Sequence, residues 1–151
     1  MDSAATRACL GFSAGAIAAL LFHQGLAEIF DITGIGRNIA FRLTPTWPFG
    51  IPALVSLTFW GAMYGVVLAL LMPRFRRPLW QVGVAMGLIA GLVTLFVTLP
   101  LKGFPLAHGW AVWPIARTLI LTTSWGLGTG LILALLQPRP LHRPVTPVVR
   151  A

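Results

Sequence analysis

Charged residues are scarce in this sequence, and their scarcity excludes most classes of soluble protein. Only 9% of the 151 residues are charged and 57% are hydrophobic, whereas an ordinary soluble domain has about 25% charged residues. So few charged side chains do not cover the surface of a soluble globule of this length. We therefore predict an integral membrane protein, and the length fits a single domain.

Acidic residues and cysteines are rarer still. Three acidic residues stand against 11 basic ones, which gives a formal net charge of +8. The basic residues lie in short segments between apolar runs, where orientation in a membrane and contact with lipid headgroups account for them. We therefore expect a lipid bilayer and no nucleic acid as partner. The single cysteine, Cys9, excludes an intramolecular disulfide and a metal site made of several cysteines.

The motifs of common enzymes and cofactor proteins are also missing. The sequence contains no HExxH, Walker A, CxxCH or GxSxG pattern. A haem needs axial ligands, and His23 is the only histidine inside an apolar run, since His108 and His142 lie in connecting or terminal segments. We expect a protein that is not an enzyme and that holds neither a metal nor a cofactor.

Four apolar segments are long enough to cross a membrane, because a spanning helix needs about 20 residues. They cover residues 8–27, 51–72, 79–99 and 115–136. Pro52 and Pro114 lie at helix starts, where the missing N–H has no cost. The pattern predicts an all-α membrane protein, a bundle of four transmembrane helices, followed by a proline-rich tail at 137–151.

The basic residues are unequally divided between the two sides of this arrangement. Seven belong to the N-terminus, the loop after the second helix and the tail: Arg7, Arg74, Arg76, Arg77, Arg139, Arg143 and Arg150. Four belong to the other side: Arg37, Arg42, Lys102 and Arg117. The positive-inside rule predicts that both termini and the 73–78 loop are cytoplasmic. The two clusters, Arg74/Arg76/Arg77 and Arg139/Arg143, fix this orientation and also suit an anionic lipid.

An internal repeat links the second and fourth helices. Nine of the fifteen positions from Trp60 to Arg74 recur from Trp125 to Arg139, including the tryptophan, two glycines, the proline and the arginine. This predicts two duplicated helix hairpins that enter the membrane in the same direction, related by an axis along the membrane normal. The alternative is that small-residue packing arose independently in the two helices. Both tryptophans fall near mid-membrane, where an indole needs a hydrogen-bond partner.

Glycines four residues apart occur in every predicted helix. They are Gly11 and Gly15; Gly61 and Gly65; Gly83, Gly87 and Gly91; and Gly126 and Gly130. Small residues at this spacing form a groove that lets helices approach closely in lipid. We expect these pairs to pack the bundle, although some of them are suited to a second copy or to another protein.

Polar residues gather at the outer ends of the predicted helices: His23, Gln24, Glu28, Thr98, Lys102, Arg117, Thr118 and Thr122. Intramembrane polar residues raise a functional hypothesis by default. In one interpretation they form a periplasmic pocket, in which Arg117 and Lys102 hold an anion. In the other, Glu28 pairs with Arg117 or Lys102, while His23 and Gln24 bond to loop carbonyls and seal the end of the bundle.

Several short motifs follow one another through nearly the whole chain: FHQG at 22–25, WPFG at 47–50, FWG at 59–61, LKGxP at 101–105 and WGxGxG at 125–130. With these motifs the sequence resembles an uncharacterised family of small four-helix inner-membrane proteins of proteobacteria. The resemblance implies a location in the bacterial inner membrane, and it supplies no activity and no catalytic residue.

These observations favour a non-enzymatic accessory or stabilising subunit of a larger membrane complex, such as an energy-transducing one. The alternative is a small transporter or channel that works as a homo-oligomer and uses the outer polar residues.

Overall fold

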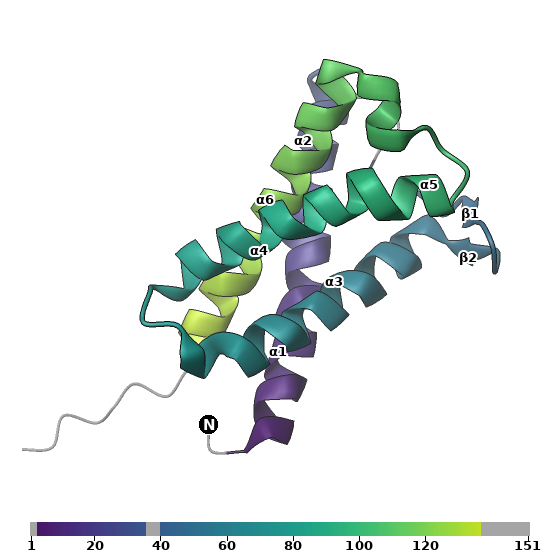
Figure 1. Cartoon of the computed structure of the whole chain (residues 1–151). Helices are drawn as coiled ribbons and strands as arrows, with labels where there is room; N and C mark the ends of the chain where they lie inside the picture. Colours follow the sequence, from purple (N-terminus) through teal and green to yellow (C-terminus); the bar gives the residue numbers. More distant parts are fainter. Residues whose placement is uncertain (1–2, 36–39, 137–151) are drawn as a thin grey trace, which may run out of the picture.

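The computed structural model describes residues 3–35 and 40–136, and Figure 1 shows how they are arranged. Four of the helices in this part of the chain are long and apolar enough to cross a membrane. They extend over Ala4–Ile32, Ala53–Arg74, Leu79–Leu101 and Val112–Leu136. The prediction of four helices that are long and apolar enough to span a membrane is therefore confirmed, and the mainly helical fold is typical of a multi-pass membrane protein.

The first span is longer than the predicted 8–27 at both ends. It begins with α1 (Ala4–Ala18), where the Ser3 side chain caps the helix by accepting a bond from the Thr6 N–H at 3.0 Å. A π-helical segment, Ala19–Gln24, follows, and α2 (Gly25–Ile32) completes the span. Hydropathy alone missed these ends, because polar residues at a membrane surface stay helical without being apolar.

The second span is preceded by a small hairpin. Strand β1 (Pro45–Thr46) pairs antiparallel with β2 (Ile51–Pro52), so the first two residues of the predicted helix 51–72 form a strand. Pro52 is the residue directly before α3 (Ala53–Leu71), which ends in a 3₁₀ turn, Met72–Arg74. Because proline has no N–H to donate, it suits the residue before a helix.

The third and fourth spans form the other half of the molecule. The third consists of α4 (Leu79–Val93), a π-helical segment, Thr94–Thr98, and the short α5 (Leu99–Leu101). A 3₁₀ segment, Leu106–Trp110, connects it to α6 (Val112–Leu136), which starts three residues before the predicted 115.

The helices pack in the order α3, α1, α6, α4, so that α1 and α6 are central and α3 and α4 lie outside (Figure 1). Glycines form the closest contacts. A Cβ on Gly65 of α3 would lie 2.9 Å from the Cα of Gly15 in α1, and a Cβ on Gly126 of α6 would lie 2.8 Å from the Cα of Gly87 in α4. Both distances are too short for a side chain, so the backbones touch directly.

Small residues also make up much of the buried interior. Ala14, Leu68, Ala69 and Leu133 form one buried cluster, and Ala18, Ala19, Ala90 and Trp125 form another. Many of the large apolar side chains lie on the outer surface instead. This distribution is typical of helices that associate in lipid, where burying leucine brings no gain but close backbone approach does.

Candidate functional site

Apart from Thr122, which lies in the middle part of α6, the predicted polar residues lie toward the end of the bundle that carries the connections between the first and second spans and between the third and fourth. We call this the connection end, and the opposite end, which carries Arg7, Arg74, Arg76 and Arg77, the arginine end. At the connection end the structure separates the predicted residues into two groups rather than one pocket. One group belongs to the first span, and the other to the start of α6.

Gln24 is the centre of the first group. Its side chain is 5% exposed, and its Oε1 accepts a hydrogen bond from the backbone N–H of Phe41. Its Nε2 lies 3.3 Å from Nδ1 of His23. Because an amide nitrogen only donates, His23 accepts this bond at Nδ1 and carries its ring proton on Nε2. The expectation that Gln24 bonds a loop carbonyl is wrong in its chemistry, since the loop provides an N–H instead.

A second hydrogen bond joins the first span to the residue before Phe41. Oδ2 of Asp31 accepts from the backbone N–H of Ala40 at 2.9 Å. Asp31 was absent from the predicted polar cluster, because its partner is a backbone group nine residues away and leaves no side-chain pattern in the sequence. Gln24 and Asp31 together hold the backbone of residues 40 and 41 against the first span.

His108 organises the second group. Thr118 Oγ1 donates to the Pro114 carbonyl at 3.0 Å, which leaves a lone pair to accept from His108 Nε2 at 3.1 Å. Burial lowers the pKa of His108, and the positive charge of Arg117 lowers it further. His108 was not among the predicted site residues, since it lies outside the apolar runs. The structure thus brings together Arg117 and Thr118, which were predicted, and a neutral imidazole, which was not.

The other predicted members are placed less closely. Thr122 Oγ1 donates to the Thr118 carbonyl at 2.9 Å, as intramembrane threonines commonly do. Lys102 lies beside Trp47 at a shallow hollow of about 320 Å³, and half-buried Thr98 ends the π-helical segment of the third span. Glu28 is exposed, and among the described residues no ion pair joins it to Arg117 or Lys102. The expected ion pair is therefore wrong, because Glu28 lies on an exposed side of α2.

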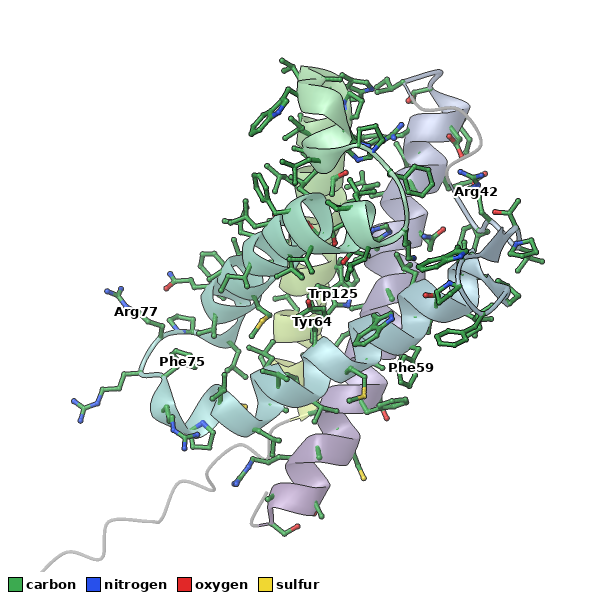
Figure 2. The ribbon with its side chains drawn as sticks, turned by 45° about the vertical axis from the view of Figure 1, so that its right-hand side comes forward. Arg42, Phe59, Tyr64, Phe75, Arg77 and Trp125 are labelled. Atoms are coloured by element: carbon green, nitrogen blue, oxygen red, sulfur yellow. The ribbon has the colours of Figure 1, made fainter. Side chains whose placement is uncertain are left out.

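The two mid-membrane tryptophans have different environments. Trp125 Nε1 donates to the Gly15 carbonyl at 3.0 Å, and its ring meets that of Tyr64 edge-on at 6.1 Å (Figure 2). Trp60 is 59% exposed and contacts the ring of Phe59 instead. The expectation of an indole partner therefore holds for Trp125 only, since α6 is buried between two helices while α3 has one side against lipid.

A neighbouring bond also joins the two halves of the molecule. Ser124 Oγ donates to the Phe22 carbonyl at 3.2 Å, within the π-helical segment of the first span. A Cβ on Gly128 would lie 2.9 Å from Cδ1 of Phe22, so the ring fits against bare backbone. A π-helical segment leaves carbonyl groups without their usual i+4 partners, which makes them available as acceptors. Sequence periodicity did not reveal these segments or the bonds that they accept.

The glycines are used mostly between helices of this one chain. Gly11, Gly15, Gly61 and Gly65 lie between α1 and α3, while Gly83, Gly87, Gly91, Gly126 and Gly130 lie between α4 and α6. A hollow of about 360 Å³ remains on the outer side of α1 and α3, and its lining is apolar except for Thr58. Thr58 Oγ1 is buried and has no hydrogen-bond partner within residues 3–35 and 40–136.

The chemical capacity of these groups is limited. Within the described residues no three His, Cys, Asp or Glu side chains come together as metal ligands would. Arg139 and Arg143 of the predicted lipid-facing clusters, and the tail at 137–151, lie outside the described residues. No family model, curated protein or solved structure matches the chain.

Proposed function

We propose that this chain is a non-enzymatic accessory subunit that stabilises a larger assembly, such as an energy-transducing complex, in the bacterial inner membrane. The observation that carries the proposal is the way the bundle interior is closed by bonds within the chain. Trp125 binds the Gly15 carbonyl, and Ser124 binds the Phe22 carbonyl. Because the interior is occupied in this way, a partner protein would bind to the outer surface of the helices.

The outer surface suits contacts inside a membrane. Large apolar side chains on the first, second and third spans point outward, among them Phe12, Phe59 and Phe96. Aromatic side chains supply much of the contact area where proteins meet. They are available to another membrane helix here, since the small residues are mostly engaged inside the bundle.

The orientation that we propose puts both termini in the cytoplasm. Arg7, Arg74, Arg76 and Arg77 lie at one end of the bundle, and the positive-inside rule assigns that end to the cytoplasm. Single cysteines test this in a Cys9→Ala background. We expect Phe49→Cys at the connection end to react with an impermeant maleimide added outside the cell, and Phe75→Cys at the arginine end to be protected. The opposite labelling would overturn the orientation.

We also propose that the two hairpins arose by duplication. The pairing of α1 with α3 and of α4 with α6, both through glycines, supports the proposal. Gly11 and Gly83 are also counterparts, since each begins a GxxxGxIA pattern in its helix. Their contacts differ in register by one turn: Gly11 faces Gly65 and Ala69, whereas Gly83 faces Gly126 and Gly130, the counterparts of Gly61 and Gly65. On this proposal the copies diverged after α6 took the central position and α3 the outer one.

A homo-oligomeric transporter is the second candidate, because Arg117 and Lys102 have no carboxylate partner among the described residues and lie half-buried at the connection end. Such cations suit an anionic substrate. Arg117→Gln and Glu28→Gln discriminate between the two candidates. A transporter loses flux on Arg117→Gln and keeps normal protein levels, whereas the exposed Glu28 serves as the matched control that leaves both unchanged.

Native mass analysis of the chain, extracted gently from its own membrane, tests the leading proposal. We expect the 16.3 kDa chain to migrate with a larger protein at fixed stoichiometry. A chain that runs alone with lipid overturns the proposal, and a homo-oligomer without other chains transfers support to the transporter.

A further inference from the structure

The charged residues are sorted between the two ends of the bundle. Within the described residues the arginine end holds four cations, Arg7, Arg74, Arg76 and Arg77, and no carboxylate, while Glu28 and Asp31 lie at the connection end. The length of the first span, Ala4–Ile32, separates the two ends. The arginine end therefore carries a concentration of positive charge that these two acidic groups do not neutralise.

Arg7 is only partly in contact with water. Its Nε atom is buried and makes no hydrogen bond to any described residue. A guanidinium has five N–H donors, and leaving a buried one without an acceptor is costly. An oxygen-rich anion from outside the chain would satisfy it, because arginine and phosphate fit each other through parallel N–H bonds.

The packing of α1 against α3 places Arg7 and Arg74 at the same end of the bundle. A Cβ on Gly11 would lie 2.6 Å from the Cβ of Ala69. Arg7 lies one turn before Gly11 in α1. Pro73 lies about one turn after Ala69, in the 3₁₀ turn that follows the antiparallel α3, and Arg74 is the next residue. The 3₁₀ turn Met72–Arg74 then leads into the connection that carries Arg76 and Arg77.

Two aromatic side chains mark this end as lying at the membrane surface. Phe75, between Arg74 and Arg76, is 44% exposed, and Trp80 at the start of α4 is 46% exposed. Aromatic side chains are typical of the headgroup region. In Figure 2 the Arg77 side chain extends away from the ribbon next to Phe75. Cations beside exposed aromatic rings at helix ends fit a lipid headgroup, whose phosphate and acyl chains lie at the same two depths.

We propose that the arginine end is a binding site for the phosphate of an anionic lipid, with phosphatidylglycerol as the representative class. Arg74, Arg76 and Arg77 attract the headgroup, and Arg7 gives its buried N–H to a phosphate oxygen. The site is independent of the accessory role, since it requires only that the four helices cross a membrane.

Lipid titration of the purified full chain in mild detergent, followed by native mass spectrometry, tests the site. We expect phosphatidylglycerol to bind more tightly than phosphatidylcholine, by roughly tenfold or more, because several arginines each favour the anionic headgroup. An arginine near a lipid surface is worth about fivefold in affinity, so Arg7→Gln should weaken binding about fivefold and the triple change of Arg74, Arg76 and Arg77 to Gln about a hundredfold. The matched control is Arg42→Gln, an exposed arginine at the connection end, which should leave binding unchanged.

Three results would overturn the proposal. Equal affinity for phosphatidylglycerol and phosphatidylcholine would show that the charge of the headgroup is not recognised. An equal loss on Arg42→Gln and Arg7→Gln would show that only net charge matters. Displacement of the lipid by millimolar inorganic phosphate would assign the site to a soluble anion. Arg7→Gln keeps three arginines in the α3–α4 connection, so its effect is measured in a chain whose orientation signal is retained.

Discussion

The direct contact of backbones between α4 and α6 makes a sharp prediction for Gly126→Ala. A Cβ at this position would lie 2.8 Å from both the Cα and the N of Gly87, whereas ordinary van der Waals contact begins at 3.4 Å. The carbonyl oxygen of Gly83 would lie closer still, and all of these atoms belong to the backbone of the facing helix, so no flexible side chain moves aside. The helices must therefore separate locally by more than the roughly 0.6 Å by which the Gly87 contacts are too short. Overpacking of this kind costs about 1–3 kcal/mol in free energy of unfolding.

Gly25→Ala is the matched control. Gly25 has helical backbone angles, and a Cβ there would meet no atom within 4 Å. Alanine is the better helix former, so the control should be neutral or more stable by up to about 1 kcal/mol. Unfolding by sodium dodecyl sulfate in mixed micelles, followed by tryptophan fluorescence, measures both free energies. If Gly126→Ala stays within about 0.5 kcal/mol of the unchanged chain, a smaller effect than overpacking allows, the close approach of α4 and α6 is refuted.

Three further predictions concern the contacts between the halves and the connection end. Trp125→Phe removes an interhelical hydrogen bond and should lower the free energy of unfolding by about 0.6–1.7 kcal/mol. Trp60→Phe, at an exposed position, should change this free energy little. Equal effects of the two substitutions would contradict the packing order of the helices. Gly128→Ala should lower the free energy of unfolding, because its Cβ would overlap the Phe22 ring. In a double-mutant cycle, Phe22→Ala should remove most of this loss of stability. Additive losses from the two substitutions would contradict a contact between the two residues. The pKa of His108 in the folded chain is lowered from 6.5, so the unfolded chain binds more protons, and stability should fall as pH drops below 6.5 and through the lower folded pKa. His108→Gln should weaken this dependence of stability on pH. If His108→Gln leaves the dependence of the melting temperature on pH unchanged, the pKa shift is refuted.

The parts of the fold that the sequence predicted are those that depend on local composition. A run of apolar residues about 30 Å long makes a spanning helix whatever its neighbours are, so the four spans were found. Glycine spacing also predicted close contacts, since a small residue leaves a groove on any helix. Both features are properties of a single helix and need no knowledge of its partner.

The parts that were missed depend on residues far apart in the sequence. The bond from Phe41 to Gln24 joins positions 17 residues apart, and the bond from Trp125 to Gly15 joins positions 110 apart. The repeat gave Trp60 and Trp125 the same expected environment, but the first is exposed because α3 lies outside and the second is buried because α6 is central. Which helix takes the central position is decided by the packing of all four.

In-cell photo-crosslinking tests most directly whether the chain acts through its outer surface. A benzophenone amino acid replaces Phe12, Phe59 or Phe96, each on the outer side of a different helix, and replaces the fully buried Leu68 as the control. The accessory role predicts that at least one outward position gives a covalent adduct with a different membrane protein, while Leu68 gives none. Adducts with lipid alone at all three outward positions would contradict it.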